Sequence, residues 1–456
     1  MDNDNLPFRA YDIRGIYNKD ITPEFAKHLG NAFVRFLDAK YLVVGKDARK
    51  GSHELADALI QGIRDAGATA VVLGDVSTPQ FYFSLFYEYV FDGGIMITAS
   101  HNPKEYNGFK LCGRNAQPIF FENGLEQIKS LLLSYTLLAD NKKGGLEHQS
   151  IHQEYLSFMS SNHKQLSRSF HILADTSNGM GIYEITTLQK ILGANSKITI
   201  FNETIDGSFP AHEPNPTLSN VLTPLCLQVK KTQGVDFGIA FDGDADRIVF
   251  VTRDGTVVSP DIITGIVALQ VASRGDLVGV DMRTSPGVVD ELTKKGIVVK
   301  RTISGNPFLK KTLYEQEGIF GGERSAHYVF SSLHYTDSSL LTLLNVMRYL
   351  DTHNLSLEDA CAPFLAKWTS LPEKNFSVQQ PEQTLFMLEE FIQEQYNDCE
   401  DFLLTKEDGL TLQTSTIFVN IRKSNTEPLL RLTIHATSQE VACELDEIFS
   451  LFLNKH

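Results

Sequence analysis

The sequence has few cysteines and no long apolar run. The five cysteines among its 456 residues are odd in number, scattered and without a CxxC pair, which argues against a disulfide framework and a zinc site and favours a reducing compartment. The N-terminus lacks the positive charge that opens a signal peptide, and no uninterrupted apolar run reaches about 18 residues. We therefore expect a soluble, cytoplasmic protein without a membrane partner.

Positive charge is also scarce. Lysine and arginine number 41 against 56 aspartates and glutamates, for a formal net charge of -15, which disfavours a nucleic-acid-binding surface and an anionic membrane surface. The sequence contains neither G-x-x-x-x-G-K-[ST] nor G-x-G-x-x-G, so a nucleotide-driven reaction has no support.

The composition supports several hydrophobic cores. The chain is 42% hydrophobic and 21% charged, as is typical of globular proteins. At roughly 150 residues per domain, the length predicts about three domains.

A strand, helix, strand pattern occurs three times, which is typical of parallel α/β layers. The three sets cover 41–45, 52–66 and 70–73; 171–175, 182–192 and 197–200; and 277–281, 287–295 and 297–300. The last ninety or so residues differ, since they predict strands at 416–421 and 429–435 and an amphipathic helix at 438–453. Thr437 and Glu440 would form a capping box for that helix.

The most specific motif is the run Asp242-Gly-Asp-Ala-Asp-Arg247, which follows an apolar segment. In an extended chain, side chains alternate with a period of two, so Asp242, Asp244 and Asp246 would present three oxygen ligands to a hard cation such as Mg²⁺. An EF-hand loop needs Gly and Glu at its sixth and twelfth positions, where this chain has Arg247 and Arg253. The remaining alternative is an ordinary charged hairpin turn.

A second polar loop, Thr98-Ala-Ser-His-Asn-Pro103, follows the apolar residues 95–97. The Ser100 hydroxyl can carry a phosphoryl group if a neighbouring side chain manages its proton and a cation screens the phosphate. Lys110 is a candidate acid or base near it. Read alone, the loop fits an ordinary Asn-Pro turn equally well. A single lysine is more often a solvent-exposed surface residue than a catalytic one.

Two further loops contain groups that suit a sugar phosphate. Glu323 and Ser325 offer an acceptor and a hydroxyl for sugar hydroxyls, and His327 can move protons near neutral pH. The turn at 422–428 brings guanidinium, ammonium and hydroxyl groups together, which suits a phosphate. Ordinary polar connections are the alternative for both.

Together these loops resemble the motifs of the α-D-phosphohexomutase family, in its phosphomannomutase/phosphoglucomutase branch. Phe8-Arg-Ala-Tyr-Asp-Ile-Arg-Gly15 is similar to the family's N-terminal signature, and the other motifs follow in family order up to Arg431. The resemblance implies three related mixed α/β domains plus a smaller C-terminal α+β domain around a central cleft. We expect these domains at 1–143, 144–249, 250–365 and 366–456, with polar linkers at about 139–150 and 369–382 and no clear linker near residue 250.

The resemblance also implies roles for single residues. Ser100 would be the phosphoserine and would bind Mg²⁺ together with Asp242, Asp244 and Asp246. The other catalytic residues would be Arg14, His101, Lys110, Arg247 and His327. Substrate would be bound by Tyr11, Arg283, Glu323, Ser325, Arg422, Ser424, Asn425, Thr426 and Arg431. The chain differs from many members at Ile303-Ser-Gly-Asn306, where a histidine is common, and at Arg283, where a lysine is common.

The implied reaction is reversible phosphoryl transfer between O1 and O6 of a hexose phosphate. A hexose 1,6-bisphosphate would be both intermediate and activator. We expect mannose phosphates as the small-molecule substrates, with glucose phosphates as a second pair, and a monomer or dimer. The alternatives are a phosphoglucosamine mutase, a metal-dependent sugar-phosphate phosphatase and a catalytically silent sugar-phosphate sensor.

Overall fold

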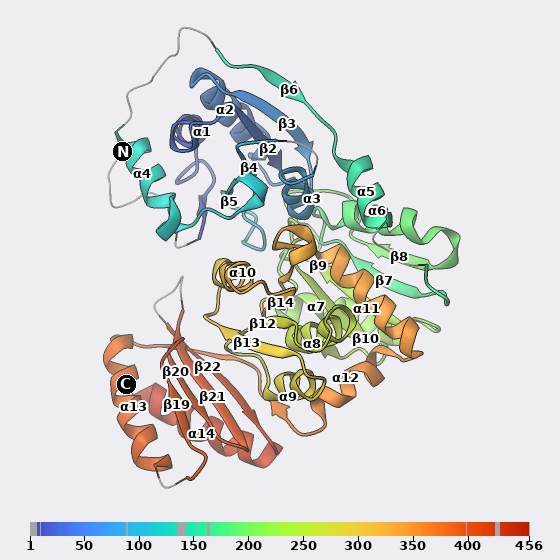
Figure 1. Cartoon of the computed structure of the whole chain (residues 1–456), viewed down its shortest axis with the longest axis vertical. Helices are drawn as coiled ribbons and strands as arrows, with labels where there is room; N and C mark the ends of the chain where they lie inside the picture. Colours follow the sequence, from blue (N-terminus) through green and yellow to red (C-terminus); the bar gives the residue numbers. More distant parts are fainter. Residues whose placement is uncertain are drawn as a thin grey trace. The chain divides into compact units, whose positions relative to one another are not determined.

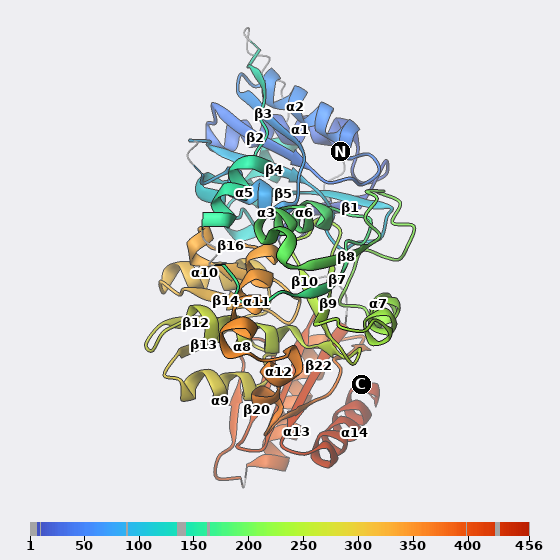
Figure 2. The same cartoon turned by 90° about the vertical axis from the view of Figure 1, so that its right-hand side faces the viewer.

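The structure is a computed structural model, and it describes residues 7–9, 11–87, 90–134, 143–161, 165–397, 399–424 and 429–455. Its contacts divide the chain into two compact units. The N-terminal unit contains the residues up to Ser259 and residues 325–357, and the C-terminal unit contains residues 260–324 and 358 onward. Figures 1 and 2 show the elements of both units. No helix in the described part of the chain is both long enough and apolar enough to cross a membrane.

The first sheet of the N-terminal unit has six strands in the order β1-β5-β4-β2-β3-β6. The strands are β1 (Ile13–Ile16), β2 (Tyr41–Lys46), β3 (Thr69–Asp75), β4 (Gly93–Ile97), β5 (Tyr106–Gly113) and β6 (Leu146–His148). Strands β4, β2, β3 and β6 are parallel, whereas β5 and β1 are antiparallel to their neighbours. The accompanying helices are α1 (Pro23–Leu37), α2 (Ser52–Asp65), α3 (Thr78–Ser84), α4 (Leu125–Leu133) and α5 (His152–Ser161), with short 3-10 helices at Arg114–Ala116 and Phe121–Asn123.

Helices α1 and α2 approach each other at two glycines. A Cβ atom on Gly62 of α2 would lie 1.9 Å from the carbonyl oxygen of Lys27, and a Cβ on Gly30 of α1 would lie 2.4 Å from that of Leu59. Because side chains are missing at these points, the two backbones pack closely over the first hydrophobic core, in which Phe33 is fully buried.

The second sheet has the order β11-β10-β9-β7-β8. Its strands are β7 (His171–Asp175), β8 (Lys197–Phe201), β9 (Phe237–Phe241), β10 (Ile248–Thr252) and β11 (Val257–Val258), with helices α6 (Gly181–Leu192) and α7 (Ser219–Lys231) and a 3-10 helix at Gly193–Asn195. Strands β8, β7 and β9 are parallel, and β10 returns antiparallel to β9. The chain re-enters this unit through the hairpin β15 (Tyr328–Phe330) and β16 (Thr336–Asp337), a 3-10 helix at Ser331–Leu333 and α11 (Ser339–His353).

The C-terminal unit contains two sets of strands. The parallel set β13-β12-β14 consists of β12 (Leu277–Asp281), β13 (Val298–Thr302) and β14 (Phe320–Gly322), with helices α8 (Pro260–Val271), α9 (Pro286–Lys294), α10 (Asn306–Glu315) and α12 (Leu357–Leu365). The antiparallel set consists of β17 (Thr369–Ser370), β18 (Lys374–Ser377), β19 (Leu403–Thr405), β20 (Leu410–Gln413), β21 (Ile417–Lys423) and β22 (Leu429–Ala436). Helices α13 (Pro381–Tyr396) and α14 (Gln439–Lys455) accompany it and share its hydrophobic core.

These sheets confirm the predicted class, α/β units with a C-terminal α+β module. Each predicted strand and helix of the three repeated patterns is present, with ends shifted by no more than two residues. The four predicted domain ranges stay predictions; the limit between residues 249 and 250 falls inside β10.

Three local predictions were wrong. The stretch 369–382 is no linker, because β17 and β18 within it pair with β22. In the stretch 139–150, residues 139–142 lie outside the described residues. The remaining part includes β6, which pairs with β3, so it is no simple linker. The cap of α14 is Ser438, one residue beyond the predicted Thr437, since its hydroxyl accepts the Val441 N–H.

A buried carboxyl group joins three helical segments of the N-terminal unit. Glu184 of α6 is fully buried, and its carboxyl accepts hydrogen bonds from the hydroxyl of Ser77, which caps α3, and from that of Tyr155 in α5, at 2.9 Å. Burial raises the pKa of Glu184 to about 7, although both hydrogen bonds oppose this shift. Between about pH 4.5 and pH 7, the folded protein therefore holds a proton on Glu184 that the unfolded chain has released.

This proton predicts a pH-dependent stability that Glu184→Gln removes. The unfolded carboxyl titrates near its ordinary pKa of 4.5 and the folded one at about 7, so the contribution is lost as pH rises through this window. Between about pH 4.5 and 8, urea unfolding should show the original protein losing about 3 kcal/mol relative to the variant. The control is Glu126→Gln at an exposed carboxylate in α4. A difference that does not change with pH would contradict the shift.

Candidate active site

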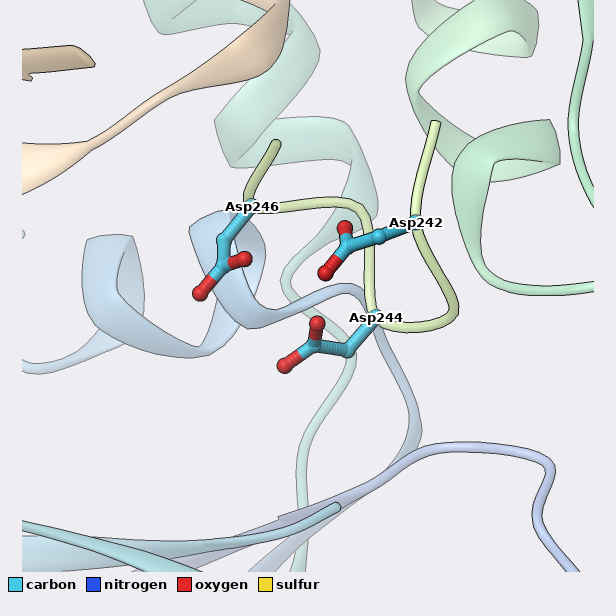
Figure 3. A group of neighbouring side chains, drawn as sticks. All are labelled: Asp242, Asp244 and Asp246. Atoms are coloured by element: carbon cyan, nitrogen blue, oxygen red, sulfur yellow. The ribbon is translucent and has the colours of Figure 1, made fainter. Parts of the chain in front are cut away.

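Three aspartates converge in the loop between β9 and β10. Asp242, Asp244 and Asp246 are at most 2% exposed, and each offers an oxygen within 4.8 Å of those of the other two. Figure 3 shows their carboxylates on one side of the loop. The predicted extended segment was wrong, because the loop is a turn with Ala245 at a φ of 63°. The hairpin turn, and not the period of two, brings the carboxylates together.

Cationic groups from other segments compensate this buried negative charge. The Lys110 ammonium on β5 lies 2.7 Å from Asp244 Oδ2 and 2.5 Å from Asp246 Oδ2. Burial alone would lower the pKa of Lys110, but Asp244 and Asp246 raise it above its ordinary value. Burial and repulsion by the other two carboxylates raise the pKa of Asp242 well above its usual range. Burial opposes ionisation of Asp246 too, but the Lys110 ammonium brings its pKa well below that range.

Ser100 lies beside this cluster. It follows β4 in the left-handed conformation, with a φ of 49°, and its hydroxyl donates to Asp242 Oδ2 at 2.7 Å. The Ser100 hydroxyl oxygen also lies 3.3 Å from Nδ1 of His101. Burial, with Arg247 and Arg14 nearby, holds the pKa of His101 well below its ordinary value, so His101 is neutral at pH 7.

Arg14 on β1 contacts the loop that carries Ser100. Its Nη1 donates to Asn102 Oδ1 at 2.6 Å and to the Ala99 carbonyl at 3.3 Å, while its Nε donates to Asp12 at 2.6 Å. Tyr11, three residues earlier, is partly buried in the same unit.

His327 is tied to the aspartate loop through the backbone. It forms an antiparallel bridge with Arg247, and its Nε2 lies 3.3 Å from Arg247 Nε and 3.6 Å from Asp246 Oδ1. Its Nδ1 lies 2.9 Å from Ser325 Oγ. A neutral imidazole protonated at Nδ1 satisfies both short contacts, since Arg247 can only donate. The Nε2 lone pair then accepts the Arg247 Nε–H.

The C-terminal unit holds a second cluster, which is cationic. Arg422 on β21 and Arg431 on β22 are directly opposite each other. Glu373 accepts hydrogen bonds from Arg431 and Arg283, each at 3.2 Å. Burial opposes ionisation of Glu373, but Arg283 and Arg431 hold its pKa below the ordinary value. Asp281 fixes Arg283 in turn, because its Oδ2 accepts from Arg283 Nη2 at 2.7 Å.

Other predicted substrate-binding residues are in this unit as well. Ser424 accepts a hydrogen bond from Arg431 Nη2 at 3.3 Å, and Glu323 accepts one from the Gly305 N–H at 2.9 Å. At the segment that differs from the family pattern, the Ser304 N–H donates to Asp408 at 2.9 Å. Asn425 and Thr426 lie outside the described residues.

The predicted site residues thus fall into two groups. The N-terminal unit brings together the serine, the acidic cluster and the proton-transfer candidates, namely Arg14, Ser100, His101, Lys110, Asp242, Asp244, Asp246, Arg247, Ser325 and His327. The C-terminal unit contains Arg283, Glu323, Arg422, Ser424 and Arg431.

Sequence reasoning missed several residues that hold these groups in place. Thr78 fixes Asp244 twice, since its N–H donates to the Asp244 carbonyl at 2.9 Å and its hydroxyl to Oδ2 at 2.6 Å. No local pattern marks Thr78 or Glu373, whose partners are far away in sequence, and Asn102 lies in the predicted serine loop but was given no role. Asp281 carried a signal, because it ends an apolar strand where α/β sheets place ligands.

Comparisons with known proteins agree with this arrangement. Models of the phosphoglucomutase/phosphomannomutase family match in order: α/β/α domain I at residues 5–136, domain II at 153–255, domain III at 259–367 and the C-terminal domain at 374–451. A phosphomannomutase of Methanocaldococcus jannaschii is 34% identical, covering 99% of this chain and 98% of its own. One of Escherichia coli K12 is 31% identical, covering 94% of each chain.

A solved structure shares the fold over the whole length. The crystal structure of a phosphoglucomutase/phosphomannomutase family protein from Burkholderia thailandensis covers 99% of this chain and 98% of its own, with a TM-score of 0.86 and 27% identity. The chain therefore belongs to the phosphoglucomutase/phosphomannomutase family. It is an enzyme of carbohydrate metabolism, an isomerase that moves a phosphoryl group within a phosphosugar.

Because the Lys110 ammonium pairs with two buried carboxylates, we expect it to be required for stability when no divalent cation is supplied. Lys110→Met leaves Asp244 and Asp246 buried without their ammonium partner, so the free energy of unfolding in EDTA should fall by about 3 kcal/mol or more. Urea denaturation measures this change.

The matched control is Lys46→Met, which breaks an ion pair with Asp75, a side chain that is 45% exposed. This variant should lose less than about 1 kcal/mol. Equal losses in the two variants would contradict the compensating role of Lys110.

Proposed function

We propose that the enzyme transfers a phosphoryl group reversibly between O1 and O6 of mannose phosphates, with glucose phosphates as a second pair of substrates. Ser100 would carry the phosphoryl group, and a hexose 1,6-bisphosphate would be the intermediate and the activator. The observation that carries this proposal is the hydrogen bond of 2.7 Å from the Ser100 hydroxyl to Asp242, because a hydroxyl at the edge of a carboxylate cluster is suited to carry a phosphoryl group beside a cation.

The cluster fits a magnesium ion. Oδ1 of Asp244 and Oδ1 of Asp246 are buried, and neither accepts a hydrogen bond from any residue in the described part of the chain. Buried carboxylate oxygens in a group of three are the ligands that Mg²⁺ prefers. Asp242, Asp244, Asp246 and the phosphate on Ser100 would hold the ion, which would neutralise charge on the phosphoryl group.

The chain's own groups would manage the protons. A sugar hydroxyl oxygen attacks the phosphorus on Ser100, the Oγ–P bond breaks, and a new O–P bond forms on the sugar. We assign the sugar hydroxyl's proton to His327 and the proton taken up by Oγ to Lys110. In the second half, Ser100 takes the other phosphate from the bisphosphate and both protons return. Arg247 would stabilise the transferring phosphoryl group, with Arg14 and His101 holding the serine loop.

The C-terminal unit would bind the phosphate that is not transferred. Arg422 and Arg431 are directly opposite each other on β21 and β22, and Arg431 bonds the Ser424 hydroxyl. Such a set of donors suits a dianion, and Asn425 and Thr426 would join it. The sugar would be bound by Tyr11, Arg283, Glu323 and Ser325. Such a second anion site favours a mutase over a phosphatase, since hydrolysis does not require a bisphosphate to be held in two orientations.

Loss of the Ser100 hydroxyl tests the phosphoryl carrier. We expect Ser100→Ala to lower turnover more than about 100-fold, because the phosphoryl group then has no acceptor on the enzyme, and to remove the phosphate adduct from the intact mass spectrum. The control is Ser84→Ala, another buried serine, whose hydroxyl bonds the Phe81 carbonyl within α3. Turnover near normal in Ser100→Ala would disprove the carrier role.

The substrate proposal is tested with mannose 1-phosphate, glucose 1-phosphate and glucosamine 1-phosphate side by side, with Mg²⁺ and trace bisphosphate. We expect formation of the 6-phosphate from mannose 1-phosphate in particular, without matching release of inorganic phosphate. Turnover of the amino sugar alone would indicate a phosphoglucosamine mutase, and stoichiometric inorganic phosphate would indicate a phosphatase.

A further inference from the structure

The loop that carries Ser100 makes little regular structure of its own. Between the end of β4 at Ile97 and the start of β5 at Tyr106 it forms turns, and Ser100 adopts a left-handed conformation that residues other than glycine rarely adopt. Within the loop, the Thr98 hydroxyl accepts the Ser100 N–H at 2.8 Å. A conformation of this kind persists only where surrounding groups hold it.

One buried guanidinium supplies four contacts to this loop. Nη2 of Arg49 donates to the carbonyls of Ser100 and Asn102, each at 2.6 Å. Nη1 of Arg49 donates to the carbonyls of Pro103 at 2.9 Å and Tyr106 at 3.2 Å. These bonds engage all four hydrogens on the two terminal nitrogens. A lysine, with three donors on one nitrogen, cannot reproduce this planar set.

Arg49 is itself held firmly. Its side chain has no exposed surface, its Nε lies 3.4 Å from Asp47 Oδ2, and its N–H donates to Asp47 Oδ1 at 3.0 Å. The Phe209 ring covers the guanidinium, with 4.9 Å between the ring centroid and Cζ. Arg49 is therefore a fixed support for the loop and not a side chain that moves with it.

The aspartate loop packs closely against the Ser100 carbonyl as well. A Cβ atom on Gly243, between the metal-site aspartates, would lie 2.5 Å from the Ser100 carbonyl oxygen. With its carbonyl held between Arg49 and Gly243, Ser100 points its hydroxyl at Asp242, 2.7 Å away.

We infer that Arg49 is a positioning residue for phosphoryl transfer: its four hydrogen bonds hold Ser100 in the conformation that aims Oγ at the aspartate cluster. This role rests on the proposed function, in which Ser100 Oγ gives its proton to Lys110 and bonds to phosphorus, while the bond from phosphorus to the sugar oxygen breaks and that oxygen takes the proton held by His327. Arg49 touches neither substrate nor the reacting atoms.

The test is Arg49→Lys, which keeps the charge and loses the fork of donors. Dephosphorylated enzyme is mixed with glucose 1,6-bisphosphate and Mg²⁺, and the phosphate adduct is followed by rapid quench and intact mass. We expect the rate of adduct formation and kcat to fall about 100-fold, because small misplacements of a reacting atom are costly. KM for the sugar phosphate and the Mg²⁺ concentration for half-maximal rate should stay within about threefold, a split that a general structural defect would not produce.

Two further variants keep the test informative. Arg168→Lys is the matched control, since Arg168 also bonds a carbonyl, that of Leu355 at 2.8 Å, and covers an aromatic ring, Phe170 at 4.4 Å; its transfer rate should stay within about twofold. Should Arg49→Lys fail to fold, Asp47→Asn weakens the support of the guanidinium while its Oδ1 still accepts from the Arg49 N–H and the Ser52 hydroxyl. About tenfold slower adduct formation is expected there.

Folded Arg49→Lys or Asp47→Asn enzyme that forms the adduct at the original rate would overturn the positioning role alone. Absence of any adduct in the unaltered enzyme would overturn the proposed function, and the positioning role with it.

Discussion

The N-terminal unit depends on the burial of three carboxylates in one loop. Placing Asp242, Asp244 and Asp246 away from water costs several kcal/mol for each charge unless cations compensate it. The main compensation comes from a distant segment, since the Lys110 ammonium on β5 of the first sheet lies 2.7 Å from Asp244 and 2.5 Å from Asp246. Charge balance therefore joins segments that are far apart in sequence, and Ser100 lies where they meet.

The C-terminal unit shows the opposite electrostatic arrangement. Arg422 and Arg431 face each other across two strands, an arrangement that is unfavourable unless an anion is near. The Glu373 carboxylate supplies part of the compensating negative charge, because it accepts hydrogen bonds from Arg431 and Arg283. The proposed substrate phosphate would supply more, which explains how a protein with a net charge of -15 can bind a dianion. Local clusters, and not the overall charge, decide what such an enzyme attracts.

The sequence was sufficient for those features that are local in the chain. The repeated patterns predicted strands such as β7 and β12 correctly, because a buried strand is a short apolar run. The aspartate spacing identified a true cluster for a wrong reason, since a hairpin turn and not an extended segment brings the carboxylates together. Contacts such as Thr78 to Asp244 or Arg49 to the Ser100 loop could not be predicted, because they depend on how β2, β3, β4 and β9 are brought together. The cap Ser438 was missed because Thr437 beside it is also a good capping residue. Strand β18 was missed because it depends on its pairing with one neighbouring strand, β22.

The central claim is that the phosphoryl group on Ser100 ends in the product. One turnover of enzyme carrying an isotopically labelled phosphate on Ser100, mixed with excess unlabelled mannose 6-phosphate and Mg²⁺, tests it most directly. Transfer through a bisphosphate predicts that the label leaves Ser100 and appears at O1 of mannose 1-phosphate, while the serine acquires the unlabelled phosphate. Label that appears as inorganic phosphate, or that stays on the enzyme while product forms, would contradict this account.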